Sequence, residues 1–105
     1  MCRKVHGALF VIFSDVSDDA FEIERGADNL SVFESSPGNG RYFCKTCSSV
    51  IYNKMPGSSV IFILTGTLDD SAHPGHLEGK ERHIFWGSRA PWMEMSDDLP
   101  KADEY

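Results

Sequence analysis

The sequence predicts a small, mainly β protein. Turn-forming residues recur about every 8 to 12 positions, a spacing typical of short strands. In addition, no stretch of a dozen residues has the amphipathic periodicity of a helix. With 105 residues the chain has room for one thin core, so we expect a single domain over residues 1–105.

The composition is that of an ordinary globular protein, with 41% hydrophobic and 25% charged residues. It excludes a disordered tail, a collagen-like repeat and a disulfide-dense scaffold. The net charge of −6 and the absence of a Lys/Arg cluster argue against nucleic acid as a partner. The longest apolar run, residues 60–64, is far shorter than the roughly 20 residues that span a membrane, so no membrane partner is expected.

The expected strands follow from apolar runs and from alternation of apolar and polar residues. Residues 59–64 form the strongest of these segments, residues 8–13 predict a buried strand, and residues 21–24 alternate like a half-buried one. The other expected strands are residues 30–34, 41–44, 50–53 and 83–86.

The segments between the strands have turn chemistry. Residues 35–40 and 71–82 contain Pro and Gly and are expected to be loops. Thr67 is expected to cap a single helical turn with Asp70 three residues later. The aromatic residues Phe43, Trp86 and Trp92 are expected in the core. An alternative for Trp92, which follows Pro91, is an exposed position in the wall of a pocket.

The sharpest chemical signal is the Cys-x2-Cys pair of Cys44 and Cys47. Two thiolates at this spacing face one point and suit Zn²⁺, which prefers tetrahedral thiolate ligands. Lys45 lies between them and could offset their negative charge. A redox pair, a disulfide and two buried thiols remain as alternatives, because one such pair is only half of a zinc site.

Further ligands must come from elsewhere in the chain. Cys2 is one candidate, and His73 and His76 share a loop, although a solvated turn that binds nothing is the preferred interpretation of that loop. We interpret His83, at the start of an apolar segment, as structural. Three cysteines cannot all pair, and no signal peptide precedes the fold, so we expect a reducing, cytoplasmic compartment.

Several short motifs together resemble one known family. They are Cys2-Arg3-Lys4-x-x-Gly7-Ala8, Arg41-x-Phe43-Cys44-x-x-Cys47-Ser48-Ser49, Gly66-Thr67-Leu68-Asp69-Asp70, His83-Ile84, Ala90-Pro91-Trp92 and Asp98-Leu99-Pro100. Their order along the whole chain is similar to that in the glutathione-dependent formaldehyde-activating enzyme family, which includes centromere protein V.

The resemblance implies a fold, a metal and an activity. The fold is the Mss4-like, or β-tent, type of small antiparallel sheets. Cys44 and Cys47 match the later pair of a structural zinc site, and Cys2 matches the last cysteine of a Cys-x-Cys-x2-Cys cluster that holds a catalytic-type zinc. The implied reaction is that of a carbon–sulfur lyase joining formaldehyde, or a related aldehyde, to glutathione or another small thiol.

The chain departs from the family pattern at two places. The early Cys-x-Cys pair and the first two cysteines of the catalytic cluster are missing, so we interpret Met1 as an internal methionine or the first strands as lost. One thiolate, Cys2, holds zinc poorly, and we expect little formaldehyde–glutathione activity from these 105 residues. Ser48 stands where the family usually has glycine, and is strained if that position needs a positive φ.

Two other functional hypotheses remain open. The chain could be a non-catalytic zinc-binding module that serves structure or interaction, or a degenerate remnant whose core survives without metal. In a homodimer, two Cys-x2-Cys pairs could complete a Cys₄ zinc site across a two-fold axis.

Overall fold

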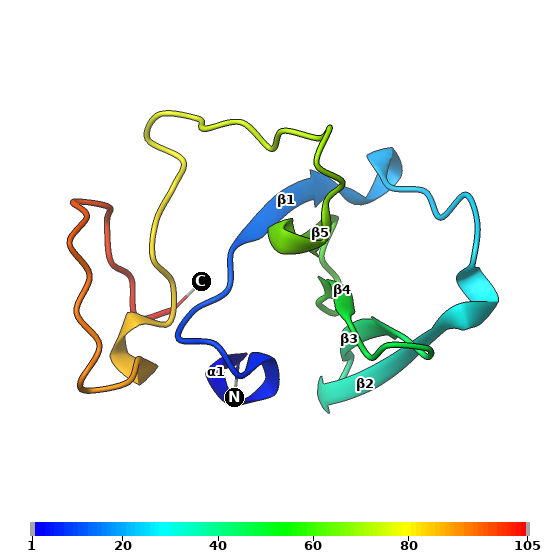
Figure 1. Cartoon of the computed structure of the whole chain (residues 1–105), viewed down its shortest axis with the longest axis horizontal. Coiled ribbons are helices and arrows are strands. Elements are labelled where there is room, and N and C mark those ends of the chain that lie inside the picture. Colours follow the sequence, from blue (N-terminus) through cyan, green and yellow to red (C-terminus); the bar gives the residue numbers. More distant parts are fainter. Residues whose placement is uncertain (1, 105) are drawn as a thin grey trace. The chain divides into compact units, whose positions relative to one another are not determined.

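A computed structural model describes residues 2–104, with side chains from Arg3 onward. The chain divides into two compact units, which we describe separately. One is Ile12–His73, and the other combines the described parts of Met1–Val11 and Pro74–Tyr105 (Figure 1). The prediction of a single domain over residues 1–105 stays a prediction.

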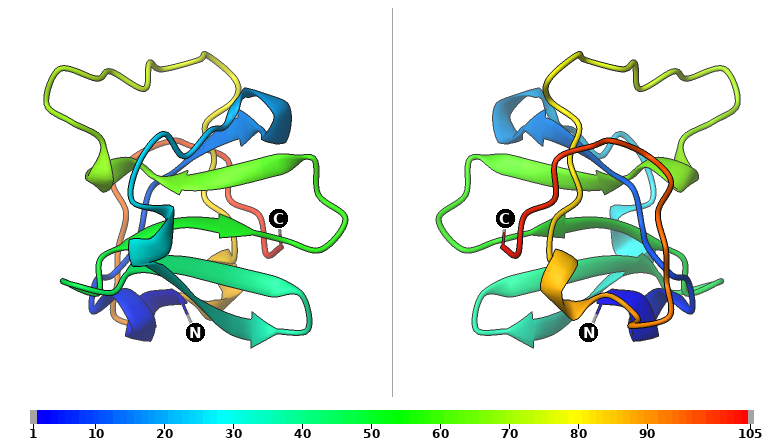
Figure 2. Two further views of the ribbon diagram at one scale, coloured as in Figure 1. Left: turned by 90° about the vertical axis from the view of Figure 1, so that its right-hand side faces the viewer. Right: turned by 90° about the vertical axis from the view of Figure 1, so that its left-hand side faces the viewer.

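The unit Ile12–His73 is built on one antiparallel sheet of five strands in the order β1-β5-β4-β3-β2 (Figure 2). The mainly β class is therefore confirmed, with one sheet where several small ones were expected. The strands are β1 (Phe13–Ser17), β2 (Leu30–Ser36), β3 (Asn39–Cys44), β4 (Val50–Lys54) and β5 (Val60–Leu64).

The core of this unit lies on the central strands. Ile61 is 1% exposed, and Tyr52, Phe62 and Leu64 are also buried. Tyr52 stacks on Tyr42 with ring centroids 4.3 Å apart. The apolar run of β5 thus supplies Ile61, Phe62 and Leu64 to this core, as its β-branched and aromatic composition predicts.

Four of the predicted strands are confirmed: residues 30–34, 41–44, 50–53 and 59–64 coincide with β2, β3, β4 and β5. The loop expected at residues 35–40 is shorter, because both strands extend into it and only Pro37 and Gly38 turn the chain. Gly38 has φ 75°, and a Cβ there would lie 2.8 Å from Cβ of Pro56. This turn therefore requires glycine.

The strand predicted at residues 8–13 is wrong. Residues 8–12 form no strand, and β1 begins only at Phe13. Leu9, Phe10 and Ile12 are 43%, 51% and 61% exposed. The more polar segment Phe13–Ser17 takes the ladder instead, because it is the one in register with β5.

The strand predicted at residues 21–24 is also wrong. The segment forms no ladder, since both sides of β4 and β5 are already paired. The inward direction predicted for Phe21 is nevertheless found, because its ring packs 4.8 Å from that of Tyr52. Ile23 is 37% exposed. The alternation was therefore a correct guide to the half-buried side chain of Phe21 but not to the backbone, which has no strand partner here.

The described residues also form four short 3-10 helices: η1 (Asp18–Ala20), η2 (Ala27–Asn29), η3 (Thr65–Thr67) and η4 (Trp86–Ser88). The helical turn expected to begin at Thr67 is wrong, because Thr67 ends η3. Its hydroxyl donates to the carbonyl of Leu64 at 2.8 Å and so closes this turn rather than capping a later one.

The second unit contains the short helix α1 (Cys2–His6), η4 and extended segments. The strand predicted at residues 83–86 is reduced to an isolated bridge between His83 and Lys101. Ala90 is fully buried. Trp92 is 68% exposed, so its prediction as a core residue is wrong, while Phe43 and Trp86 are half-buried. Among the described residues, no helix is long and apolar enough to cross a bilayer.

Truncating Ile61 tests the position of the core. We expect Ile61→Ala to lower the free energy of unfolding by about 2–5 kcal/mol, because it removes a fully buried side chain. Val32→Ala on β2 is the matched control, since Val32 is 52% exposed and its truncation should change stability by about 0.5 kcal/mol or less. Urea denaturation of both variants measures the difference, and equal effects would contradict this core.

Candidate metal centre

The connection between β3 and β4 is a tight loop that carries both cysteines of the Cys-x2-Cys pair. Cys44 ends β3 and Val50 begins β4. The amide of Cys44 donates to the carbonyl of Ser49 at 2.9 Å, and the amide of Ser48 donates to the carbonyl of Cys44 at 2.8 Å. These two bonds fold residues 44–49 into a knuckle that places both thiols in one loop.

The fold of the knuckle requires a left-handed residue at Ser48, whose φ is 63°. The strain anticipated from the sequence is therefore present, because a side chain at positive φ is unfavourable and glycine is not. The loop keeps this conformation through the backbone hydrogen bonds on either side of it.

Both thiols of the knuckle are free, with Cys44 half-buried and Cys47 exposed. Backbone amides of Cys47 and Thr46, and then the Cys47 side chain, hydrogen-bond to Cys44 and hold the pKa of its thiol below the ordinary value. The Cys47 thiol donates to the hydroxyl of Ser49 at 3.2 Å. Amides that point at sulfur favour the thiolate, which is the form that binds metal.

A short helix that precedes β2 is hydrogen-bonded to the knuckle. The 3-10 helix η2 precedes β2, and its Asn29 carbonyl accepts the amide of Lys45 at 2.9 Å. The Lys45 ammonium donates to the carbonyl of Asp28 at 2.7 Å. The predicted role of Lys45 as a counter-charge to the thiols remains a prediction, while its observed contacts tie the knuckle to η2.

The remaining predicted ligands are not gathered around these thiols by the part of the chain that the structure describes. The Cys2 side chain lies outside the described residues. His76 contacts Glu81 in the other unit, and both His73 and His76 are exposed. Among the described residues no group of three or more His, Cys, Asp or Glu could hold a metal ion. Cys44 and Cys47 thus fit half of a tetrahedral site, and the described residues do not complete it.

The chain, including this knuckle, is similar to one known protein family. The chain matches the model of the family described as glutathione-dependent formaldehyde-activating enzyme over residues 1–88. The chain belongs to this family. The match includes Cys2 and the whole knuckle, and it confirms the resemblance drawn from the sequence motifs. No curated protein and no solved structure matches the chain.

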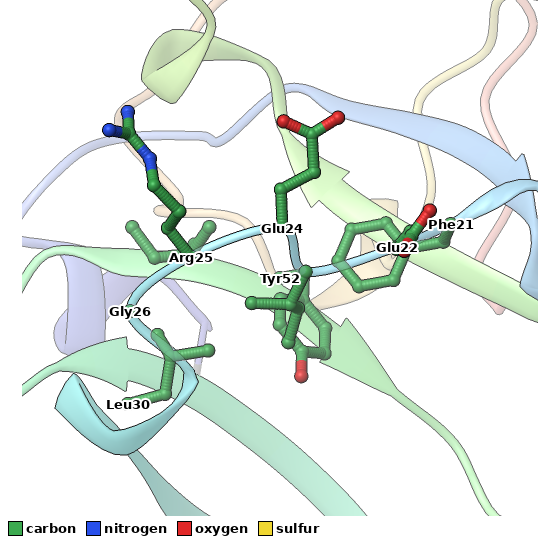
Figure 3. Close-up of a pocket in the computed structure, with 9 residues that line it drawn as sticks. Phe21, Glu22, Glu24, Arg25, Gly26, Leu30 and Tyr52 are labelled. Carbon is green, nitrogen blue, oxygen red and sulfur yellow. The ribbon is translucent and has the colours of Figure 1, made fainter.

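In this family member a pocket of about 470 Å³ opens beside the sheet (Figure 3). Its lining includes Phe21, Leu30 and Tyr52, together with the charged residues Glu24 and Arg25. Neither knuckle cysteine lines it. The pocket therefore offers apolar and charged surface but no thiol.

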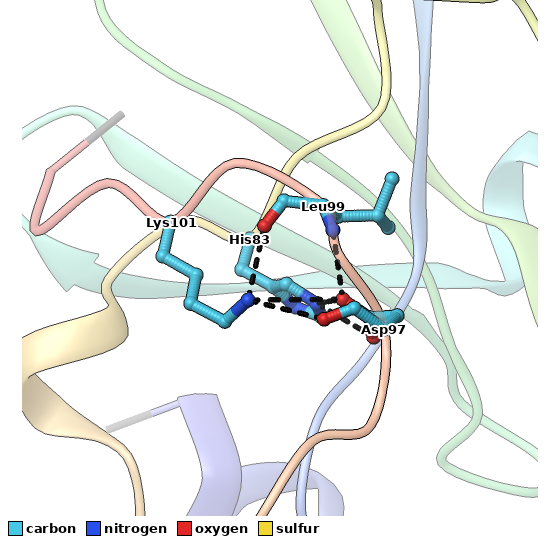
Figure 4. A network of polar contacts seen from close by, with 4 residues as sticks. All are labelled: His83, Asp97, Leu99 and Lys101. Atoms are coloured by element: carbon cyan, nitrogen blue, oxygen red, sulfur yellow. Dashed lines mark hydrogen bonds and ion pairs between the residues drawn. The ribbon is translucent and has the colours of Figure 1, made fainter.

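A second polar cluster lies in the other unit, around His83 (Figure 4). Nε2 of His83 lies 2.8 Å from one carboxylate oxygen of Asp97 and 3.0 Å from the other. Lys101 donates to the carbonyls of Asp97 and Leu99 at 3.3 and 3.1 Å. The structural role predicted for His83 agrees with these contacts, which tie residues 97–101 to it.

Sequence reasoning missed Asn29, which contacts the knuckle from 15 residues upstream of Cys44. No motif links the two positions in the sequence. The signal that the sequence offers is Gly26, a turn-forming residue, which has φ 78° in the structure and precedes η2. Only the pairing of Leu30 with Cys44 in the sheet brings this turn to the thiols.

Replacing Ser48 by glycine tests the strain in the knuckle. We expect Ser48→Gly to raise the free energy of unfolding by about 0.5–1 kcal/mol, because relief of the left-handed strain outweighs the extra entropy of glycine in the unfolded chain. Ser59→Gly, whose position does not have a positive φ, is the control and should be neutral or destabilising. If both variants shift the urea midpoint downward equally, Ser48 is not strained.

The contact between His83 and Asp97 predicts a dependence of stability on pH. The hydrogen bond with His83 lowers the pKa of Asp97. A lowered carboxyl pKa stabilises the folded state above the unfolded value of about 3.9, and this stabilisation is lost as the pH falls through the folded pKa.

We therefore expect Asp97→Asn to melt at a lower temperature than the native chain at pH 6 to 7, and the gap to narrow below about pH 4. Thermal unfolding followed by circular dichroism, from below pH 4 to pH 7, measures the difference in melting temperature. Asp98→Asn is the control, because it removes a neighbouring carboxylate, whereas the hydrogen bonds of the His83 side chain are to Asp97. A gap that does not change with pH would contradict a stabilising hydrogen bond between Asp97 and His83.

Proposed function

We propose that this chain is a zinc-binding member of its family that acts in the joining of formaldehyde to glutathione, giving S-(hydroxymethyl)glutathione. The family match over residues 1–88 supports a formaldehyde-activating function at family level. The observation that carries the zinc proposal is the knuckle, in which backbone amides and a left-handed residue hold two thiols in one tight loop.

In this proposal Cys44 and Cys47 are two ligands of a structural zinc. Zinc–thiolate sites are tetrahedral, with Zn–S distances of about 2.3 Å, and a Cys-x2-Cys pair commonly supplies two of the four ligands. Two features support the assignment here: both thiols are free, and Cys47 is exposed. The competing interpretation as a redox pair needs only these two sulfurs and no metal. The zinc content of the purified chain therefore distinguishes the zinc site from the redox pair.

Cys2 is proposed as a ligand of the catalytic-type zinc and so as the residue nearest the chemistry. A zinc held there would lower the pKa of a thiol ligand such as glutathione and so favour attack of the sulfur on the carbonyl carbon of formaldehyde. In that reaction a carbon–sulfur bond would form, the carbonyl π bond would break, and the oxygen would take up a proton. Cytoplasm, where thiols stay reduced and glutathione is available, is the proposed compartment.

The two further ligands of the knuckle zinc are proposed to come from a second copy of the chain. Residues 45–49 are all exposed, so two knuckles can approach each other. Four thiolates around one ion across a two-fold axis would form a closed Cys₄ site of the structural type. The stoichiometry expected at this site is one zinc for two chains.

Replacing single cysteines separates the two roles. We expect Cys47→Ser to lose the knuckle zinc, because one thiolate cannot chelate it alone, and to shift the chain from dimer to monomer. Cys2→Ser is the matched control and should keep both the knuckle zinc and the dimer. Zinc per chain by elemental analysis and mass by light scattering give the two readouts.

The activity is measured on the same proteins by the formation of S-(hydroxymethyl)glutathione from formaldehyde and glutathione. We expect this turnover to be low, because one thiolate, Cys2, holds zinc poorly. Turnover that depends on zinc and is lost in Cys2→Ser would support the catalytic proposal. Zinc at the knuckle without turnover in any protein would instead favour a non-catalytic zinc-binding module. Absence of zinc in the native chain, with three titratable thiols, would overturn the proposal.

A further inference from the structure

We propose that Asn29 is a positioning residue that orients the Cys44 thiolate toward the metal. This inference rests on the proposed function, because it assigns to Asn29 a part in zinc binding at the knuckle. Asn29 supplies no ligand atom in the proposed site. Its side chain acts on the ligand sulfur and on the loop that carries it.

The side-chain amide of Asn29 contacts the knuckle at two points. Its Nδ2 donates to Sγ of Cys44 at 3.5 Å, and it also lies 3.1 Å from Oγ1 of Thr46. Oγ1 of Thr46 donates back to Oδ1 of Asn29 at 3.2 Å. The amide group is therefore held by the threonine between the two cysteines while it points an N–H at the first sulfur.

The backbone around Asn29 keeps the amide in place. Its own amide donates to the carbonyl of Gly26 at 2.9 Å, and its carbonyl accepts the amide of Lys45 at 2.9 Å. The next residue, Leu30, pairs with Cys44 in the sheet. The position of Asn29 relative to the thiol is thus set on both sides by bonds that do not involve its side chain.

An N–H that donates to a metal-bound thiolate stabilises the charge on sulfur and fixes its direction. Residues that hydrogen-bond to ligands in this way commonly alter metal affinity by about 10- to 100-fold when they are removed. Asparagine suits this position because it offers a donor to the sulfur and an acceptor to the threonine hydroxyl at once. Alanine offers neither.

Cobalt is a suitable probe because Co²⁺ bound by thiolates gives charge-transfer bands that report on the sulfur. We expect Asn29→Ala to bind Co²⁺ about 10- to 100-fold more weakly than the native chain. The thiolate-to-cobalt band should also move to longer wavelength, because a sulfur that loses a hydrogen bond donates its electrons more easily. A residue that only supported the loop would lower affinity without moving this band.

Two further variants make the test specific. Asn39→Ala, at the opposite end of β3 from Cys44, is the matched control and should leave both affinity and spectrum unchanged. Thr46→Val keeps the donor to sulfur but removes the group that holds the amide, so an intermediate loss of affinity is expected. Thermal unfolding of each metal-free variant checks that the fold is retained.

The outcomes distinguish this inference from the proposed function. If the native chain binds Co²⁺ without thiolate bands, or not at all, the zinc proposal fails and the role of Asn29 fails with it. If the native chain shows thiolate bands, and a folded Asn29→Ala binds Co²⁺ as tightly with the same spectrum, only the role of Asn29 is overturned. Weaker binding with an unshifted band would also contradict it, since that is the result of loop support alone.

Discussion

The connection between β3 and β4 has to reverse the chain and still hold two thiols within one short loop. The backbone hydrogen bond that closes the loop runs from the amide of Cys44 to the carbonyl of Ser49 at 2.9 Å, and the bond from the amide of Ser48 to the carbonyl of Cys44 supports it. Closing the loop there drives Ser48 to φ 63° and leaves amide groups free to point at the sulfur of Cys44. The proposed metal chemistry, the strain and the lowered pKa all follow from this closure.

The sheet gives the knuckle its foundation. β3 and β4 lie in the interior of a five-stranded antiparallel sheet, so the loop between them starts and ends on paired backbone. The start of β2 beside Cys44 brings η2 against the loop, which adds the contacts of Asn29 and Lys45. These anchors are bonds within the chain itself, so under the zinc proposal they would hold the two thiols in one loop for the metal. Holding binding groups in place in this way lowers the entropic cost of binding.

The sequence predicted the central part of the fold well and the periphery poorly, for physical reasons. β2, β3, β4 and β5 combine β-forming residues with clear turns, and local pattern and sheet pairing agree there. Residues 8–13 and 21–24 carry equally good local patterns, but ladder partners are set by register with distant strands, which a local pattern does not contain. The same limit applies to the site: the spacing of Cys44 and Cys47 was readable, whereas Asn29 is brought to them only by strand pairing.

The central claim is that the sulfurs of the knuckle bind zinc. X-ray absorption at the zinc edge of the zinc-loaded native chain tests it most directly, because the distance and number of scatterers distinguish sulfur from nitrogen and oxygen. We predict a shell of sulfur atoms at about 2.3 Å from the zinc, with four sulfurs if two chains share the ion. A shell of nitrogen and oxygen alone, at about 2.0–2.2 Å, would contradict the account.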